Sequence, residues 1–541
     1  MNFKEIESKF QPTNDGKCAE AYSGMIATAF PDATKAGVQM FKKGGNAVDA
    51  ACAAALALGV CEPQSSGLGG QTMLLISTNN KVLAIDGSSR APSLAHVSAI
   101  YKGDRTCGYR ATTVPSTPAT LWYVNKHYGN LPWKTIMKPA IQIAERGYKI
   151  TPLQHKLQKR EMENFDKVPS QSGKNYFFDN GRPYEPGTIF RQPELALLLK
   201  KLAHKGVEEF YTGDTAKQID ADVRENGGLL RYDDLALIPW PIVRKPLRRK
   251  FRSLTIYSMP PPCAGRTLLF TLMMANTIKP KHLHSDEMKR TLLLVVIFRK
   301  ALLERSDRPF DPNFYPQVTE KEMLSKEYVH QCITEITRDT HIHIPIRETR
   351  DEVLGETTHL SVIDKDGIAV SLTQSIEKAY GSKAAAAGLG FLYNNYMIDF
   401  EYKHIAHPFY LRPNAVPWAT VAPTLIYYGD DIWMAVGSPG SERIFSSITQ
   451  FLLHVIDQHQ PISEAMMAPR LHCSLGGRVS LEADRFPNGL VDLFQEKGYR
   501  IDKRPNFSFY LGAIHAVLKK QSGAGFQGVA ERRRDGMAGG Y

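Results

Sequence analysis

The sequence has no long hydrophobic run. Its longest apolar stretch, AACAAALALGVC at residues 50–61, is rich in alanine and shorter than the roughly 20 residues that a membrane-spanning helix needs. The opening MNFKEIESKFQPTNDG also lacks the apolar centre of a secretory signal. We therefore expect a soluble, cytoplasmic protein with no membrane partner, unless a targeting segment has been removed from its start.

Cysteine is scarce and follows no pattern. The seven cysteines lie at irregular spacings without a CxxC pair, which argues against a disulfide framework and against a zinc site. The sixteen histidines are scattered, and His341 and His343 form the one close pair. Because no third ligand accompanies them, surface residues are a simpler interpretation than a metal site. We expect reduced thiols, no metal and no other cofactor.

Motifs of several common enzyme folds are also absent. The GxSxG motif of α/β-hydrolases does not occur. The stretch GLGGQT at residues 67–72 has neither the spacing of a dinucleotide-binding loop nor the lysine of a P-loop. It therefore predicts a tight turn.

Acidic residues are outnumbered by basic ones, but the excess is modest. A net charge of +12 spread over 541 residues is a weak argument for a polyanionic partner. The densest basic run, RKPLRRKFR at residues 244–252, predicts a strand with one solvent-facing side. No aromatic platform or groove-reading helix accompanies it, so we expect no nucleic-acid partner. A polyanion-binding protein is the weakest alternative that the sequence leaves open.

The hydrophobic pattern divides the chain into a helix-rich first part and a strand-rich second part. Residues 32–60 predict two helices that meet at Gly44 and Gly45, with two short strands after them. Residues 115–235 are mostly helical in pattern. After residue 356 the pattern predicts strands, with helices only in SERIFSSITQFLLHVIDQ and GLVDLFQEKGY. Because no linker separates the two parts, we expect them to build one core.

Two motifs of the second part carry candidate chemistry. In VGSPGSERI at residues 436–444, a turn before a helix could bind an anion or a developing oxyanion, although an ordinary turn is the simpler interpretation. In GETTHLSVIDKDGIAVSLTQSI at residues 355–376, Thr357 and Thr358 stand at the start of a predicted β-hairpin. They are either ordinary strand residues, or the chain is cut before a threonine whose free α-amine then serves as its base.

The motifs together resemble those of the γ-glutamyltransferase (glutathione hydrolase) family. MIATAFPDATKAGVQMFKKGGNAVDAACAAALALGVCEPQSSGLGG is followed in family order by MPPPCAGRTLL, GETTHLSVIDKDG, YNNYMIDF, APTLI, GSPGSERI and GVAERRRDGMAGGY. The resemblance covers residues 24–541. Members of this family are N-terminal nucleophile hydrolases. It therefore implies an α+β fold, a four-layer αββα sandwich that both fragments of a self-processed chain build together.

The resemblance also implies where the chain is cut. Cleavage is expected between Glu356 and Thr357. It would leave an N-terminal extension (1–23) with a large fragment (24–356), and a small fragment (357–541) that begins with the nucleophile. The two fragments would form a heterodimer, and two such heterodimers could associate.

Three further positions match residues that take part in the chemistry of the family. Ser375 falls where relatives carry a second threonine that hydrogen-bonds the nucleophile, and its hydroxyl can serve the same role. Gly440 and Ser441 fall on the paired glycines whose N–H groups form the oxyanion hole. A serine supplies the same N–H if its φ is negative.

The positions that bind substrate differ from those of relatives that use glutathione. Such relatives hold the glutamyl α-carboxylate with an arginine and two serines, but the corresponding residues here are Ser88, Ala419 and Thr420. Arg90 would share a face with Ser88 in an extended strand and could reach the same anion.

The positions that hold the α-amine of the substrate are also changed. Relatives use an asparagine, a glutamine or glutamate, and an aspartate; this sequence has Glu377, Tyr396 and Asp399. The segment that follows is shorter than in relatives with a lid, which implies an open pocket.

We therefore predict a self-processing γ-glutamyltransferase-like enzyme that cleaves small-molecule amides through a threonine acyl-enzyme. Losing one side of a buried charge pair typically costs about 2–5 kcal/mol, so efficient use of glutathione is in doubt. The alternatives are an amidohydrolase on another substrate, similar to cephalosporin acylases or oxamate amidohydrolases, and a catalytically weak pseudoenzyme.

Overall fold

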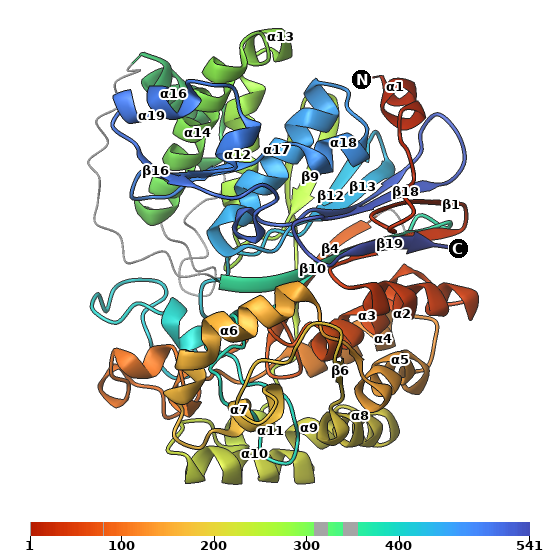
Figure 1. Ribbon diagram of the computed structural model, residues 1–541, viewed down its shortest axis with the longest axis vertical. Helices are drawn as coiled ribbons and strands as arrows, with labels where there is room; N and C mark the ends of the chain where they lie inside the picture. The colour runs from red at the N-terminus through yellow and green to blue at the C-terminus, as the bar shows by residue number, and fades with distance from the viewer. Residues whose placement is uncertain (1, 79–80, 308–322, 339–354) are drawn as a thin grey trace.

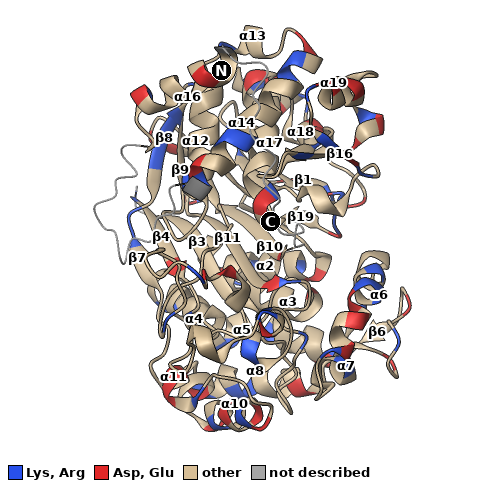
Figure 2. Cartoon of the chain, turned by 90° about the vertical axis from the view of Figure 1, so that its left-hand side faces the viewer, with Lys and Arg blue, Asp and Glu red and all other residues tan. Residues whose placement is uncertain are grey.

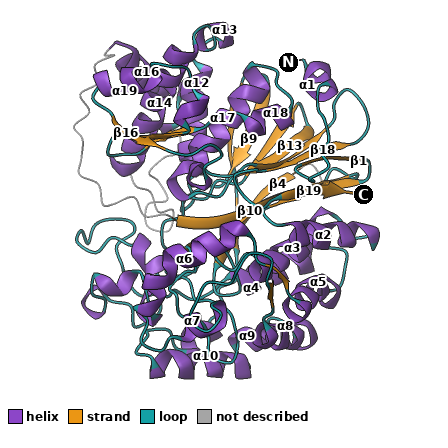
Figure 3. Cartoon of the chain, in the orientation of Figure 1, coloured by secondary structure: helices purple, strands orange, loops and turns teal. Residues whose placement is uncertain are grey.

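Two large β-sheets lie face to face at the centre of the molecule, and helices cover the outer face of each sheet (Figure 1, Figure 3). The computed structural model describes residues 2–78, 81–307, 323–338 and 355–541. Each large sheet has seven strands, and all neighbouring strands within it are antiparallel. The α+β class predicted from the sequence is confirmed.

Sheet A has the strand order β1-β18-β17-β13-β12-β9-β8. Its strands are β1 (Cys18–Ala21), β8 (Leu247–Phe251), β9 (Leu254–Ser258), β12 (Thr424–Tyr428), β13 (Asp431–Gly437), β17 (His515–Lys519) and β18 (Phe526–Ala530). Sheet B has the order β19-β2-β10-β11-β3-β4-β7. Its strands are β2 (Gly24–Thr28), β3 (Gln71–Thr78), β4 (Lys81–Gly87), β7 (Ile242–Arg244), β10 (Gly355–Asp364), β11 (Ala369–Lys378) and β19 (Met537–Gly540). Two smaller sheets contain β5 (Tyr148–Lys149) with β6 (Ile189–Phe190), and β14 (Leu471–Cys473), β15 (Arg478–Leu481) and β16 (Arg500–Lys503).

The helices form two layers, one beyond each sheet (Figure 1). The layer beyond sheet B contains α2 (Pro31–Lys42), α3 (Ala47–Cys61), α4 (Thr117–Tyr128), α5 (Trp133–Arg146), α6 (Pro152–Asp166), α7 (Ser172–Phe177), α8 (Pro193–Lys205), α9 (Glu208–Tyr211), α10 (Asp214–Glu225) and α11 (Tyr232–Ala236). The layer beyond sheet A contains α12 (Gly265–Asn276), α13 (Pro280–Leu283), α14 (Glu287–Asp307), α16 (Lys326–Arg338), α17 (Ile444–Asp457), α18 (Ile462–Met467) and α19 (Leu490–Glu496). A short helix, α1 (Phe3–Ser8), lies near the N-terminus.

Both sheets contain strands from the two sides of residue 356. In sheet A, β1 pairs with β18 and β9 pairs with β12. In sheet B, β2 pairs with β19 and with β10, and β3 pairs with β11. Five strand pairs therefore join the first 356 residues to the rest of the chain.

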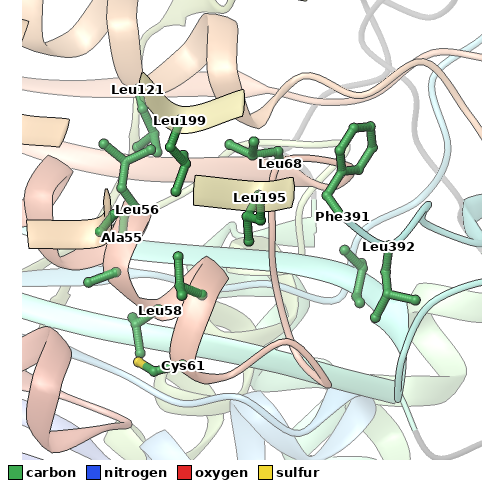
Figure 4. Close-up of a cluster of buried hydrophobic side chains, with 14 of the residues drawn as sticks. Ala55, Leu56, Leu58, Cys61, Leu68, Leu121, Leu195, Leu199, Phe391 and Leu392 are labelled. Carbon is green, nitrogen blue, oxygen red and sulfur yellow. The ribbon is translucent and has the colours of Figure 1, made fainter. Parts of the chain in front are cut away.

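The alanine-rich helix α3 lies at the centre of the helical layer beyond sheet B. A capping box begins it, because the Asn46 side chain accepts from the backbone N–H of Asp49 while the Asp49 carboxylate accepts from the N–H of Asn46. Its small side chains let neighbouring helices approach closely. Figure 4 shows Leu56 and Leu58 of α3 in one buried cluster with Leu121 of α4 and Leu199 of α8.

The structure confirms most of the elements expected from the sequence pattern. The two predicted helices around Gly44 are α2 and α3, and the two short strands after them are β3 and β4. The sequence pattern missed α18, which is shorter than two full turns and follows Pro461 directly. Residues 2–23 are part of the fold, because they supply α1 and an edge strand of sheet A.

The basic run at residues 244–252 is the edge strand β8, as its alternating pattern predicted. Leu247 and Phe251 are buried, and the basic side chains between them are more exposed. Figure 2 shows this strand in blue at the edge of the sheet, whereas acidic and basic residues are mixed over the helices. Charged residues at an edge also discourage pairing with other chains.

Candidate active site

Thr357 and Thr358 of the hairpin predicted at residues 355–376 lie in strand β10, at a break in its pairing with β11. Glu356 pairs with Glu377, but Thr358 pairs with Gln374. One residue of β10, Thr357, therefore lies opposite two residues of β11, and the extra residue forms a β-bulge. Bulges are common beside active sites because they redirect side chains.

The hydroxyl of Ser375 joins both sides of the peptide bond between residues 356 and 357. It accepts a hydrogen bond from the Thr357 hydroxyl (3.3 Å) and donates one to the carbonyl oxygen of Glu356 (2.7 Å). It also accepts from the N–H of Glu377 (2.8 Å). The single donor and both acceptor positions of the Ser375 hydroxyl are therefore in use. Thr357 and Ser375 are only 3% and 2% exposed, so this geometry is fixed inside the protein.

The side chain of Glu356 is held separately. It is 1% exposed, and its carboxylate lies 3.1 Å from a guanidinium nitrogen of Arg534 and 3.6 Å from one of Arg160. Burial raises the pKa of Glu356, while Arg534, Arg160 and Arg443 act in the opposite direction.

The predicted oxyanion-hole residues lie in a turn that touches this strand. A Cβ added to Gly355 would be 2.7 Å from the Cβ of Ser441, so only a glycine fits there. Within the described part of the chain, neither the N–H of Gly440 nor that of Ser441 has a hydrogen-bond acceptor. The expected negative φ at Ser441 is wrong, since its φ is +54°. The turn begins with Gly440 at +125° and then contacts β10, which holds Ser441 in a conformation that costs roughly 1–3 kcal/mol.

Three of the predicted substrate-binding residues gather beside Ser375. Burial, and then the proximity of its partner carboxyl group, raises the pKa of Asp399 well above its usual range, and burial raises that of Glu377. The pKa of Tyr396 is also raised well above its usual value, by burial first and then by these two carboxyl groups. Ser375 and Gln71 lie near its hydroxyl and act in the opposite direction. Two adjacent carboxyl groups favour sharing one proton.

The other four predicted substrate-binding residues are not part of this cluster. The hydroxyl of Ser88 donates to the carboxylate of Asp86 (2.5 Å), which also pairs with Arg244 at 2.7 Å. Arg90 does not reach the same group; its guanidinium lies 3.4 Å from the side-chain oxygen of Asn414. Strand β4 ends at Gly87, so Ser88 and Arg90 lie beyond its regular pairing, and their side chains bind different partners.

Ala419 and Thr420 lie in a loop beside Cys263. The N–H of Ala419 donates to the carbonyl of Pro262 (3.1 Å), and its side chain packs in the core between the sheets. Among the residues that the structure describes, no hydrogen bond joins Ser88, Arg90 or this loop to Thr357.

The sequence analysis did not identify Arg160, Arg534, Glu62 or Gln71 as site residues. Arg534 also contacts Glu62 at 3.3 Å, and the side chain of Gln71 accepts from Ser89. Gln71 lies within the glycine-rich stretch GLGGQT and Glu62 lies shortly before it, where the sequence predicts only a tight turn. Arg160 lies mid-helix in α6, where no local pattern distinguishes it from a surface arginine.

The described residues contain no group of three or more histidine, cysteine or carboxylate side chains that could hold a metal ion. All seven cysteines are free thiols. The predicted surface pair His341 and His343 lies outside the described residues. No helix in the described ranges is both long and apolar enough to cross a membrane.

Comparisons with known proteins find similar sequences and structures over almost the whole chain. A family model described as gamma-glutamyltranspeptidase matches residues 33–541. The glutathione hydrolase proenzyme of Pseudomonas aeruginosa is 30% identical, over 94% of this chain and 92% of its own length. The acylase ACY 1 proenzyme of Pseudomonas sp. (strain SE83) is 28% identical, over 97% of this chain and 94% of its own. Among solved structures, a cephalosporin acylase from Bacillus halodurans aligns with a TM-score of 0.86 at 27% identity, covering 98% of both chains.

Proposed function

Because this chain belongs to the gamma-glutamyltranspeptidase family, we propose that it is a self-processing amidohydrolase with Thr357 as its nucleophile. Thr357 first attacks the peptide bond that precedes it and later attacks the amide of a small-molecule substrate. The observation that carries this proposal is the Ser375 hydroxyl, which contacts both the Thr357 hydroxyl and the Glu356 carbonyl oxygen.

The self-cleavage proceeds in two steps, an acyl transfer from nitrogen to oxygen and an ester hydrolysis. The Thr357 oxygen bonds to the carbonyl carbon of Glu356, the C–N bond breaks, and the hydroxyl proton ends on the released nitrogen. The product is an ester with a free α-amine. Water then hydrolyses the ester, which gives a C-terminal carboxylate and restores the Thr357 hydroxyl. The hydroxyl of Ser375 already donates to the Glu356 carbonyl oxygen, so it can stabilise the negative charge that develops there.

The mature enzyme repeats the same chemistry on a substrate. The new α-amine of Thr357 accepts the proton of its own hydroxyl as that oxygen attacks the substrate amide. The N–H of Gly440, which has no acceptor among the described residues, lies in the turn beside the strand that carries Thr357 and can bind the oxyanion. The φ of +54° at Ser441 does not meet the condition set for its N–H, so Gly440 is the proposed donor. Transfer of the acyl group to water gives hydrolysis, and transfer to an amine gives transpeptidation.

The mature protein is a heterodimer of the two fragments, which together build the sandwich of two sheets between helical layers. The five strand pairs that join the fragments support this assembly. Proenzymes among its relatives support it as well.

The substrate pocket favours an acyl group other than a plain γ-glutamyl group. The arginine and two serines that bind the α-carboxylate in glutathione-using relatives are replaced by Ser88, Ala419 and Thr420. Ser88 is instead bonded to Asp86, whose charge Arg244 already neutralises. The acidic pair of Glu377 and Asp399 keeps a site for an ammonium group. A γ-glutamyl substrate is the second candidate, since relatives named glutathione hydrolase match nearly the whole chain.

Intact mass and N-terminal sequencing of the purified protein test the proposed nucleophile. We expect two chains, the smaller beginning Thr-Thr-His-Leu, and a single chain for T357A. T357S keeps a hydroxyl nucleophile and should still be cut. An uncut wild-type chain would contradict the proposal.

Paired substrates test the acyl specificity. We expect faster release from a 4-aminobutanoyl anilide, which keeps the ammonium group and lacks the α-carboxylate, than from a γ-glutamyl anilide. Release from a glutaryl anilide, which keeps the carboxylate and lacks the ammonium group, should be slower than from the 4-aminobutanoyl anilide. R90A serves as the control, because Arg90 contacts Asn414 rather than the nucleophile. If the γ-glutamyl anilide is preferred and R90A abolishes its turnover, Arg90 binds the α-carboxylate and the preference stated here is wrong.

A further inference from the structure

Glu356, the residue before the proposed cut, is held by its side chain as well as by its carbonyl group. We propose that Arg160 and Arg534 form a carboxylate clamp that holds Glu356 and so positions the scissile peptide bond for attack by Thr357. The inference rests on the proposed self-cleavage and makes the two arginines positioning residues for it.

The contacts come from parts of the chain that are far apart in sequence. Arg160 belongs to α6, and Arg534 lies between β18 and β19, seven residues from the C-terminus. Both reach the carboxylate of Glu356, at 3.6 Å and 3.1 Å. A buried carboxylate is strongly stabilised by such cations and is costly without them. The fold has therefore built a site for one specific side chain.

Each arginine is itself held in place. Arg534 also contacts the carboxylate of Glu62 (3.3 Å) and the hydroxyl of Ser65 (3.4 Å), in the loop after α3. Arg160 donates to the neighbouring Glu161 at 2.9 Å. The guanidinium groups are thus pre-oriented, and the clamp does not depend on Glu356 to form.

Together with the clamp, other contacts hold the two consecutive residues Gly355 and Glu356. Gly355 rests against Ser441, the carbonyl of Glu356 is bonded to Ser375, and the side chain of Glu356 is fixed by the arginines. Holding a residue by its carbonyl and by its side chain fixes the orientation of its carbonyl carbon. A displacement of about 1 Å at a reacting centre can slow a reaction by about 10²-fold.

A cavity adjoins the clamp and gives small ions access to it. Its volume is about 620 Å³. The clamp pocket is lined by both arginines together with Phe507, Phe509 and Tyr510. A guanidinium ion, which matches a missing arginine head group, can enter such a space.

The test follows the rate of self-cleavage in full-length chains, by gel and intact mass after synthesis in a cell-free reaction. We expect R534M, R160M and E356Q each to be cut at least about tenfold more slowly than the wild type. R534K should recover part of the rate. Added guanidinium chloride at millimolar concentration should accelerate R534A but not the wild type.

The matched control is R532M, in the same run of three arginines. Arg532 pairs with Asp15 at the surface (2.8 Å), so its loss should leave the rate within about twofold of the wild type. Melting temperatures of R534M and R532M, each combined with T357A so that the chain stays uncut, separate misfolding from mispositioning. Guanidinium rescue of R534A excludes misfolding independently.

Three results would overturn the clamp. Wild-type rates in R534M, R160M and E356Q would show that Glu356 needs no partner. Equal slowing in R532M would show a general charge effect. Slow cleavage of R534A without rescue by guanidinium or lysine, together with a lowered melting temperature, would show a structural role only. In all three cases a cut wild-type chain leaves the proposed function standing, whereas an uncut wild-type chain removes both.

Discussion

At the scale of single residues, the proposed self-cleavage depends on one hydroxyl group. Ser375 uses its donor and both acceptors on the groups that surround the bond to be cut. Threonine, which relatives carry at this position, and serine both have a hydroxyl group here, and serine is the smaller side chain. The role predicted for Ser375 from the family pattern remains a prediction, and the hydrogen bonds supply its physical basis.

Replacing Ser375 tests that role. S375A removes the donor to the Glu356 carbonyl, and loss of one oxyanion donor typically costs about 10²–10³-fold in rate. We expect self-cleavage of S375A to slow by that order and S375T to be cut at nearly the wild-type rate. Time courses of the two fragments measure both; equal rates for S375A and the wild type would contradict the assignment.

Glu62 offers a test by pH. Burial raises its pKa from 4.5 to about 7, although Arg534 acts against this shift. Between these values the folded chain binds a proton that the unfolded chain has lost. The contribution of Glu62 to stability is therefore full at low pH and is lost as pH rises through 7.

The variant E62Q is neutral at every pH and should remove this dependence. Both proteins carry T357A so that the chain stays uncut. We expect the unfolding free energy of E62Q minus that of the Glu62 protein to rise by up to about 3 kcal/mol from pH 5 to pH 8. Urea denaturation at the two pH values measures the difference. An unchanged difference would mean that Glu62 stays ionised in the fold.

At the scale of elements, the glycine-rich loop before β3 presses against the strand that carries Ser375. A Cβ on Gly70 would lie 2.3 Å from the carbonyl oxygen of Ser375, and one on Gly69 would lie 2.0 Å from that of Leu392. The sequence correctly predicted a tight turn at GLGGQT. It could not reveal that Gly70 allows the backbone of β11 to approach, or that Gly69 does the same for the backbone at Leu392.

This close approach makes Gly70 a sensitive position. We expect G70A to push β11 outward, to lower the unfolding free energy by about 1–3 kcal/mol and to slow self-cleavage. Gly103 is the control, since a Cβ there meets nothing within 4 Å. Melting temperature and the cut fraction should change for G70A and stay constant for G103A.

Elements with a local sequence signal could be predicted, whereas contacts between distant elements could not. Periodicity and glycine placement predicted the hairpin at residues 355–376, the helix pair around Gly44 and the edge strand at residues 244–252, because these signals are local. The bulge at Thr357 and the positive φ of Ser441 arise from contacts between strands and turns. The approach of Arg160 and Arg534 to Glu356 spans 374 positions (534 − 160), so no local pattern could indicate it.

At the scale of the whole molecule, the strand order decides what a cut at residue 356 would do. Five strand pairs cross between the two fragments. Lys17, near the start of the chain, also donates to the carbonyls of Arg534 (3.0 Å) and Gly536 (2.6 Å) near its end. Separating the fragments would require both sheets to come apart.

We therefore expect the fragments to remain associated after cleavage. They should elute together in size-exclusion chromatography at nanomolar concentration, at the volume of uncut T357A, and should separate only in denaturant. Dissociation on simple dilution would show that the sheets contribute less than their topology indicates.

The strand pairs that join the two sides of residue 356 make folding before the cut different from folding after it. Before the cut, folding is a reaction of one chain with itself, and its rate does not depend on concentration. After the cut, an unfolded molecule could recover only if two separate chains met, and each would meanwhile expose unpaired strand edges that favour aggregation. The same broken bond that frees the nucleophile would then make folding a one-way event, so that each active molecule has a single opportunity to fold.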